Sequence, residues 1–559
     1  MSGAGARLLD DTDDHPPASS STPAAAAAPA GLPWIVFLFV LIAAAANLLF
    51  GYENSMPASA VVDFMPPILH NTSAADAASQ GLQTSFLKGA LALGATVACP
   101  FAGFAQDGLG RRVTLILCCL IYMGTAAVTA TAATYAAGGF AQVAAGRLLT
   151  GAVIGVFSST VPMYIAELSP PALRGALVTV NQVCVCTGIL LGYLSSLLFK
   201  GFWRTQFAAA VPLAAASLAA FVFVTPYSPR WLMSRGREAE ARAVLGVTLA
   251  GDAAAVEGEL ERMRAVLAQV AGANRYALLR QPHIVWSIAI GCMGSIMQQW
   301  VGVNAVNSFA PQIFESAGSS SDQAHVFTVY IGVAKLVFVL VALALMDRVG
   351  RKPLLLVGCA GMALSCAGLA ASFGMEGGAA KGNTAVACLV LYMAFFEISL
   401  GPILWLLLSE LYPVEVKGVA MSVGATMCWC VARARRAASL SLSFSLSLSL
   451  SLSLSLSARA PAASSPTAPT ARTRTRRLMT YAVNQAYTPM VNALGSGPTF
   501  YFFAAVCVLS FAWIHVYLFE TRGRTLEEIQ ELLKGGKAGG AVEEQGDSFS
   551  LKALAKQNA

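Results

Sequence analysis

Four ionisable side chains lie inside long apolar stretches of this 559-residue sequence: Glu53, Arg147, Lys335 and Glu397. Charged groups in such surroundings are costly, so they usually serve a function such as carrying an ion or a proton. An adjacent cation stabilises a carboxylate in its ionised form, whereas desolvation favours the protonated form. A buried glutamate poised between these two effects can take up and release a proton.

A second group of polar residues, Gln298, Gln299 and Asn304, lies in another apolar stretch. Gln299 and Asn304 stand on either side of Gly302, which loosens a helix. Amides both donate and accept hydrogen bonds, so the cluster suits a ligand rich in hydroxyl groups. Hydrogen bonding between helices is the alternative interpretation. The sequence shows neither a nucleophile–base pair nor a set of metal ligands, so we expect no enzyme activity, no cofactor and no metal.

The elements that must hold these residues are membrane-spanning helices. The chain is 56% hydrophobic and 12% charged, with a mean hydropathy of +0.64, whereas soluble domains carry about 25% charge. We therefore expect an all-α membrane protein of twelve transmembrane helices, since a span needs about 20 apolar residues. The stretches lie near 33–54, 86–105, 113–133, 142–164, 176–199, 207–225, 284–310, 326–346, 353–373, 386–408, 419–430 and 498–519.

The net charge of +7 comes from basic residues in short loops between these stretches. Cytoplasmic loops collect Lys and Arg, so we place these loops and both termini in the cytoplasm and expect no nucleic-acid partner. The loop between the first two stretches then lies on the opposite side. It contains a sequon at Asn71, which is a candidate glycosylation site. The 12 cysteines lie mostly in apolar stretches, where they are interpreted as small buried side chains.

The chain also contains an internal repeat. DGLGRR at 107–112 matches DRVGRK at 347–352, and ELSPPALRG at 167–175 matches ELYPVEVKG at 410–418. Two six-span halves of this kind place a binding site at mid-membrane and expose it to either side by rocking. The charged residues of the repeats could hold the cytoplasmic side shut, or could merely anchor the topology. Gating candidates are Asp107, Arg111, Arg112, Glu167, Arg174, Asp347, Arg351, Glu410 and Lys417.

The repeat divides the chain into two halves, a linker and two tails. The halves are 33–225 and 284–519, and the charged, helix-forming segment 226–283 joins them beneath the bundle. Residues 1–32 are interpreted as a disordered cytoplasmic tail without a cleaved signal peptide, because no basic segment precedes the first apolar stretch. Residues 520–559 are interpreted as a polar cytoplasmic tail.

One segment does not fit a membrane bundle. Residues 439–457 alternate Ser and Leu, as a repeated TC dinucleotide encodes, and such a strand facing lipid would leave backbone groups unpaired. The apolar stretches 419–430 and 479–490 are each too short for a span, but joined they suffice. We interpret 431–478 as a retained intron or gene-model error. A genuine low-complexity insertion is the alternative.

Seven motifs in order resemble the sugar porter family of the major facilitator superfamily, over about residues 33–530. They are GRR at 110–112, GRLLTGAVIG at 146–155, SPRWL at 228–232, QQWVGVNAVNSFAPQIF at 298–314, DRVGRKPLL at 347–355, GPILWLLLSE at 401–410 and ETRGRTLEEI at 520–529. GYE at 51–53 and Lys335 look most similar to the plant vacuolar glucose transporter branch. The resemblance implies a transporter that acts by alternating access.

The resemblance also implies a sugar site. Gln298, Gln299 and Asn304 match sugar-binding amides of the seventh span, Gln182 matches a glutamine of the fifth, and Trp405 matches an aromatic residue that lines the site. Two positions depart from the family. Lys335 and Cys428 stand where asparagine is common, so recognition of hydroxyl groups there must differ.

By the same resemblance, Glu53 is expected to carry the proton and Arg147 to neighbour it. A permanent Glu53–Arg147 salt bridge that only locks the helices is the alternative. Glu397 is expected to pair with cytoplasmic-side arginines and to act in gating. The function expected is proton-coupled hexose symport by a monomer in the plasma membrane or an endomembrane, with a sugar, a proton and the lipid bilayer as its partners. A facilitative uniporter and a sugar sensor are the rivals.

Overall fold

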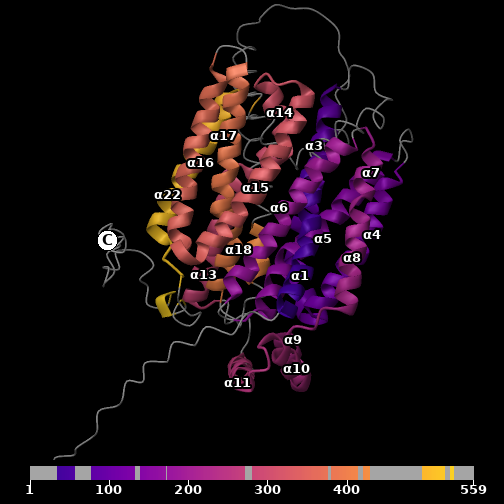
Figure 1. Ribbon diagram of the computed structural model, residues 1–559, viewed down its shortest axis with the longest axis vertical. Helices are drawn as coiled ribbons and strands as arrows, with labels where there is room; N and C mark the ends of the chain where they lie inside the picture. The colour runs from indigo at the N-terminus through magenta and orange to yellow at the C-terminus, as the bar shows by residue number, and fades with distance from the viewer. Residues whose placement is uncertain are drawn as a thin grey trace, which may run out of the picture.

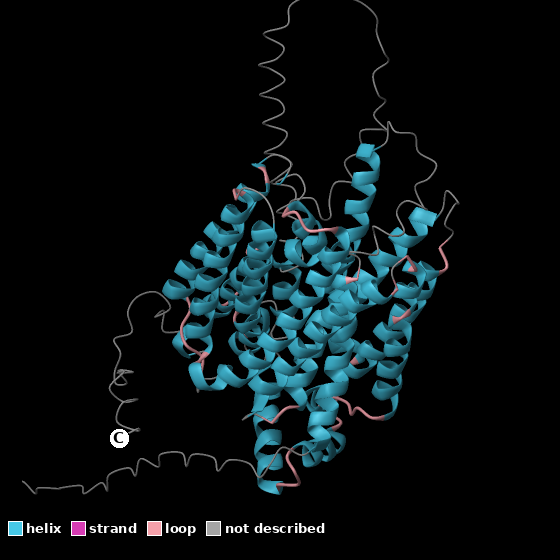
Figure 2. Ribbon diagram, turned by 45° about the horizontal axis from the view of Figure 1, so that its top comes forward, coloured by secondary structure: helices cyan, strands magenta, loops and turns pink. Residues whose placement is uncertain are grey.

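The computed structural model describes residues 34–56, 77–132, 139–170, 173–199, 201–270, 280–375, 379–412, 420–427, 491, 494–522, 529 and 531–533. Helices dominate these ranges, as Figure 2 shows. Eleven segments within them are long and apolar enough to cross a membrane, in agreement with the predicted twelve-helix all-α fold. The tail 1–32, Asn71 and the segment 431–478 lie outside the described residues.

The first half contains six spans. They are α1 (Trp34–Ser55), α3 (Ala77–Leu109), α4 (Arg111–Ala130), α5 (Gly139–Leu168), α6 (Arg174–Leu198) and a sixth made of α7 (Trp203–Ala208) and α8 (Ala210–Phe223). Two glycines bring α1 and α6 into backbone contact. A Cβ at Gly51 would lie 2.0 Å from the carbonyl oxygen of Val185, and one at Gly188 would lie 2.1 Å from that of Leu48. Small residues allow such close approach of membrane helices.

The second half contains α13 (Pro282–Trp300), α14 (Val303–Ser316), α15 (Ser321–Val349), α16 (Arg351–Phe373), α17 (Ala379–Ile398), α18 (Leu400–Leu411) and α22 (Ser496–Tyr517). Two of its spans are discontinuous. The seventh breaks at Gly302, whose φ is +103°, and the tenth breaks at Ser399, with φ −122° and ψ −99°. Broken helices place free backbone groups at mid-membrane, where transporters bind substrate. Figure 1 shows the two halves side by side.

Three short helices lie beneath one end of the bundle in Figure 1: α9 (Pro229–Ser234), α10 (Glu238–Thr248) and α11 (Ala253–Val270). Leu232, Leu245 and Leu260 form their small apolar core. Arg264 ties α11 to Glu238 of α10 by an ion pair, and its hydrogen bond holds the pKa of Glu238 below its usual range. This unit occupies most of the predicted linker.

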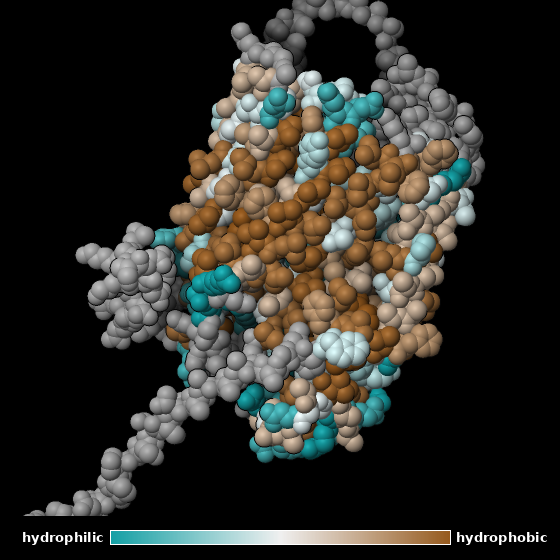
Figure 3. Space-filling model, viewed as in Figure 1, coloured by the Kyte–Doolittle hydropathy of each residue, from teal (hydrophilic) through white to brown (hydrophobic). Residues whose placement is uncertain are grey.

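The surface of the bundle is apolar over a broad middle band. Figure 3 shows hydrophobic residues across this band and hydrophilic residues gathered toward the two ends. Large side chains in the spans such as Phe104, Phe223 and Leu364 are 69%, 84% and 75% exposed. Exposed apolar surface on this scale matches a lipid environment, and the chain is an integral membrane protein.

Candidate functional site

Glu53 and Arg147 form a buried ion pair between α1 and α5. Both side chains are 3% exposed, and the guanidinium also contacts the backbone carbonyl of Glu53 at 3.5 Å. The second carboxylate oxygen accepts a hydrogen bond of 2.8 Å from the hydroxyl of Tyr122, on α4. Three helices of the first half therefore meet at one carboxylate, and each of its oxygens has a partner.

The amides of the seventh span lie around its break. Asn304, in the first turn of α14, donates a hydrogen bond to the side-chain oxygen of Gln299, near the end of α13. Gln298 donates instead to the backbone carbonyl of Leu400, at 2.9 Å, beside the break in the tenth span. The structure thus joins the two broken spans through the predicted sugar-binding amides.

Gln182 connects the halves. Its amide nitrogen, on α6, donates a 3.1 Å hydrogen bond to Glu397 on α17. The other carboxylate oxygen of Glu397 is 2.6 Å from the ammonium group of Lys335 on α15. The sequence-based expectation that Glu397 pairs with cytoplasmic-side arginines is therefore corrected. Glu397 lies one residue before the end of α17, level with Gln182, and a lysine of the neighbouring span occupies the position of its counter-charge.

Trp405, one turn into α18, is partly buried between two apolar clusters. One is the main core of the second half. The other includes Leu91, Ala95 and Ile154 of the first half, together with Ala425. Its indole ring therefore contacts apolar side chains of both halves, which suits a side chain lining a site between them.

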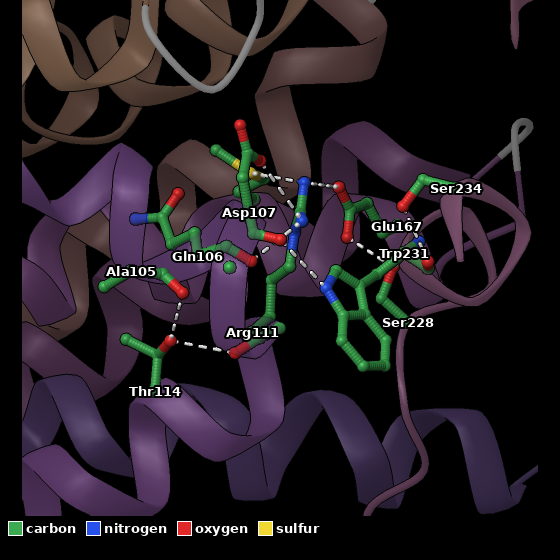
Figure 4. Close-up of polar contacts among 12 residues, drawn as sticks. Ala105, Gln106, Asp107, Arg111, Thr114, Glu167, Ser228, Trp231 and Ser234 are labelled. Carbon is green, nitrogen blue, oxygen red and sulfur yellow. Dashed lines mark hydrogen bonds and ion pairs between the residues drawn. The ribbon is translucent and has the colours of Figure 1, made fainter.

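A charged cluster lies at the end of the first half, near the short helices (Figure 4). Arg111 pairs with Glu167 at 3.0 Å and with Asp107 at 3.5 Å. The other oxygen of Glu167 accepts a hydrogen bond from the hydroxyl of Ser228. The indole of Trp231, on α9, donates to the carbonyl of Asp107 at 3.2 Å. The cluster fastens α9 to the ends of three spans.

The second half repeats this arrangement. Arg351 pairs with Glu410 at 3.2 Å, and the other oxygen of Glu410 accepts a 2.8 Å hydrogen bond from Thr521. Glu520 accepts from the backbone N–H groups of Arg351 and Lys352, each at 3.0 Å, and so caps α16. Arg351, Glu410 and Thr521 thus occupy the places that their counterparts hold in the first half. The sequence repeat is a structural repeat.

The remaining gating candidates make other contacts. Arg112 donates to the carbonyl of Phe221 at 2.9 Å, and Arg174 donates to that of Ala166 at 3.0 Å. The side chain of Asp347, as well as Lys417 and Cys428, lie outside what the structure describes. Within the described ranges, no three His, Cys, Asp or Glu residues gather as a metal site would require.

Sequence reasoning missed three polar partners: Tyr122 on Glu53, Ser228 on Glu167, and Thr521 on Glu410. Ser228 and Thr521 each lie just beyond the last span of their half, within the SPRWL and ETRGRT motifs. That shared position was a signal that could have identified them. Tyr122 lies among apolar residues of α4 and carried no such signal.

Comparison with known proteins places this fold and this site in context. The sequence matches the family described as Sugar (and other) transporter over residues 39–434 and 441–533. It is 31% identical over 422 residues to the D-xylose-proton symporter of Escherichia coli, covering 70% of this chain and 83% of that protein. It is 28% identical to the glucose transporter GlcP of Staphylococcus epidermidis, covering 89% of this chain and 97% of that one.

The solved structures agree. The proton:xylose symporter XylE bound to 6-bromo-6-deoxy-D-glucose superposes with a TM-score of 0.71 at 26% identity, covering 89% of this chain and 99% of that chain. The inward-open conformation of the E. coli xylose transporter XylE gives 0.62 at 25% identity, with coverage of 89% and 99%. Together with the repeated halves and the broken spans, these matches show that the chain belongs to the sugar porter family of the major facilitator superfamily, whose members are transporters and not enzymes.

Proposed function

We propose that the protein is a symporter that couples the movement of one proton to that of a neutral hexose-like monosaccharide. The observation that carries the proposal is the buried Glu53–Arg147 pair, held in a transporter fold by the hydroxyl of Tyr122. Ionisable groups buried within apolar spans are costly and usually serve a function. The relatives named as proton symporters for xylose support the same interpretation.

The proton enters at Glu53. In the ionised state the carboxylate is paired with Arg147 and Tyr122, which holds α1, α5 and α4 together. A proton taken from the donor side bonds to one carboxylate oxygen, cancels the charge and weakens the pair. Release of that proton to the other side restores it. Arg147 stays cationic throughout, because a guanidinium does not lose its proton in proteins.

The sugar binds between the halves. Gln182 contributes from the first half, and Gln298, Gln299 and Asn304 contribute from the second. Trp405 offers an apolar face for the ring. Sugar hydroxyls replace the hydrogen bonds that these amides make to one another, to Glu397 and to the Leu400 carbonyl, which changes how the halves are joined. The ion pairs of Arg111 and Arg351 then open or close one end of the bundle.

Radiolabelled glucose or xylose uptake into proteoliposomes tests this function. An inward proton gradient should drive accumulation above the external concentration, and a proton conductor should abolish it. Uptake that equilibrates without accumulation, whatever the gradient, would indicate a facilitative uniporter. If neither glucose nor xylose binds or enters, the proposed transport of sugars of this kind is rejected.

A further inference from the structure

A second buried ion pair lies at the site, and the proposed proton step does not use it. The Lys335 ammonium group is 2.6 Å from Glu397, and these side chains are 2% and 0% exposed. Glu397 also receives the Gln182 hydrogen bond that joins the two halves. Any change in the charge of Glu397 therefore alters the hydrogen bonding of Gln182, a residue of the proposed sugar site.

Each helix packed against Glu397 offers a different neighbour. From α6 come the amide of Gln182 and the thiol of Cys186, and from α15 comes Lys335.

The other neighbouring helices leave space or offer uncharged groups. On the α18 side, a Cβ at Gly401 would lie 2.7 Å from the carboxylate, so glycine leaves room for it. Near Glu397, Gly358 of α16 lies against the Phe395 carbonyl of α17 and against Ser399 at the break. On the α14 side, the Tyr392 hydroxyl donates to the carbonyl of Val301. Among the described residues, Lys335 is the cation within ion-pair distance of Glu397.

Lys335 depends on Glu397 in the same way. Its ammonium nitrogen lies 5.2 Å from the centroid of the Phe396 ring and 3.9 Å from the sulfur of Met393. An aromatic face and a thioether are weak partners for a dehydrated cation compared with a carboxylate. The two charges therefore stabilise each other, and loss of either leaves the other buried and uncompensated.

We propose that Lys335 is a fixed counter-cation that keeps Glu397 ionised, so that Glu397 holds the Gln182 amide across the two halves without taking up a proton. The proposal rests on the proposed sugar–proton symport. It makes Lys335 a positioning residue that acts through Glu397. It also explains how one transporter can hold two buried carboxylates and yet use only Glu53 for proton coupling.

The chemistry of Glu397 explains why its charge must be fixed. An ionised carboxylate only accepts hydrogen bonds, and it fits the N–H of Gln182. A protonated Glu397 would present an O–H donor on one oxygen, so the donor pattern at Gln182 would change with pH. Lys335 removes that pH dependence from the sugar site.

Three variants test the proposal: Lys335→Met, Glu397→Gln, and the double variant. Sugar exchange between two pools in proteoliposomes is measured from about pH 5.5 to about pH 8, because exchange needs no net proton movement. In Lys335→Met, the half-saturation concentration should rise by about tenfold or more near pH 5.5 and fall back as pH rises, because an unpaired buried carboxyl takes up a proton and its O–H then opposes the Gln182 N–H. Lys381→Met, which removes a lysine near the start of α17, the helix that carries Glu397, is the matched control and should keep the wild-type profile.

The double variant removes both charges and should regain the wild-type pH profile, with affinity within about threefold of wild type because no buried charge remains unpaired. Glu397→Gln alone should bind sugar poorly at every pH. Two results would overturn the proposal. One is a half-saturation concentration in Lys335→Met that depends on pH as in the wild type. The other is a new pH dependence of that concentration that persists in the double variant.

Thermal unfolding of the purified proteins tests the charge balance without any sugar. Lys335→Met should lose stability as pH rises, because its folded state holds a proton on Glu397 that the unfolded state releases. The double variant should not. If Lys335→Met does not accumulate in cells, the double variant must restore the yield, and equally low yields would contradict the proposal. If the wild-type protein neither binds nor moves sugar, the proposed function is rejected. The pH dependence of thermal unfolding would still test the pairing of Lys335 with Glu397.

Discussion

Asn304 donates a hydrogen bond to Gln299 across the break between α13 and α14, so the two amides are partners. A sugar hydroxyl that takes the place of either partner in this contact replaces this bond. Exchange of one hydrogen bond for another makes each contact worth only about 0.5–1.5 kcal/mol net. The affinity of the site is therefore spread over several amides.

Replacing Gln299 or Asn304 with Ala should raise the half-saturation concentration for sugar by roughly 2- to 13-fold, as loss of one such hydrogen bond predicts. The two effects should not add, because each residue is the other's partner. Ser316→Ala, at the far end of α14, should leave uptake unchanged because its hydroxyl bonds only within its own helix, to Gln312. Wild-type kinetics in both amide variants would remove these residues from the site.

Gly302→Ala should disturb both stability and sugar binding. A φ of +103° strains any residue with a Cβ by about 1–2 kcal/mol, and the added Cβ would lie 3.0 Å from the Phe503 ring. Gly318→Ala is the matched control, since its φ is +99° but its Cβ would meet open space. Both variants should melt earlier, and only Gly302→Ala should lose sugar affinity. Equal losses of affinity would show that the break does not position the amides.

The repeated charge clusters predict a change in the conformational balance. Glu167→Gln and Glu410→Gln remove the partners of Arg111 and Arg351, so together they should favour the state in which this end is open. Spin labels at Leu109 and Val349, which are 47% and 43% exposed, report the distance between the two halves. The double variant should shift this distance to longer values. Glu240→Gln, which breaks an exposed pair, should leave it unchanged, and an unshifted distance in the double variant would argue against gating by these clusters.

Deleting residues 431–478 should yield a protein that inserts into membranes and takes up sugar as the full chain does. The deletion joins two short apolar stretches into one of sufficient length for a span. The family match itself is interrupted between residues 434 and 441. Uptake and yield of the two forms, compared in the same cells, give the measurement. A deletion variant that fails to insert would identify the segment as a genuine part of the fold.

The spans and the repeat could be predicted because the length of an apolar stretch and the recurrence of a motif are visible in the sequence without knowing how the helices pack. The partner of Glu397 could not. Sequence shows how deep a residue lies in its own helix, but the facing helix is set by packing among residues far apart in the chain. Lys335 and Gln182 reach Glu397 from two other helices, and Gln182 is 215 residues away.

Of the two helix breaks, one was predicted from the sequence and the other was not. Gly302 was identified because glycine tolerates a positive φ, and the structure uses that freedom. The break at Ser399 was not predicted. Its signal was Pro402, three residues on, whose missing N–H cannot pair with the helical carbonyl before it.

Substitution of Glu53 by Gln tests the central claim, that this carboxylate carries the coupled proton, most directly. The amide keeps the size and much of the hydrogen bonding of the side chain but cannot titrate. Sugar exchange between two pools should survive in this variant, and accumulation driven by a proton gradient should collapse. If the pair with Arg147 only locks the helices, yield, binding and exchange should instead fall together, because the guanidinium is left buried and unpaired. A stable Glu53→Gln protein that still accumulates sugar on a proton gradient would contradict the account.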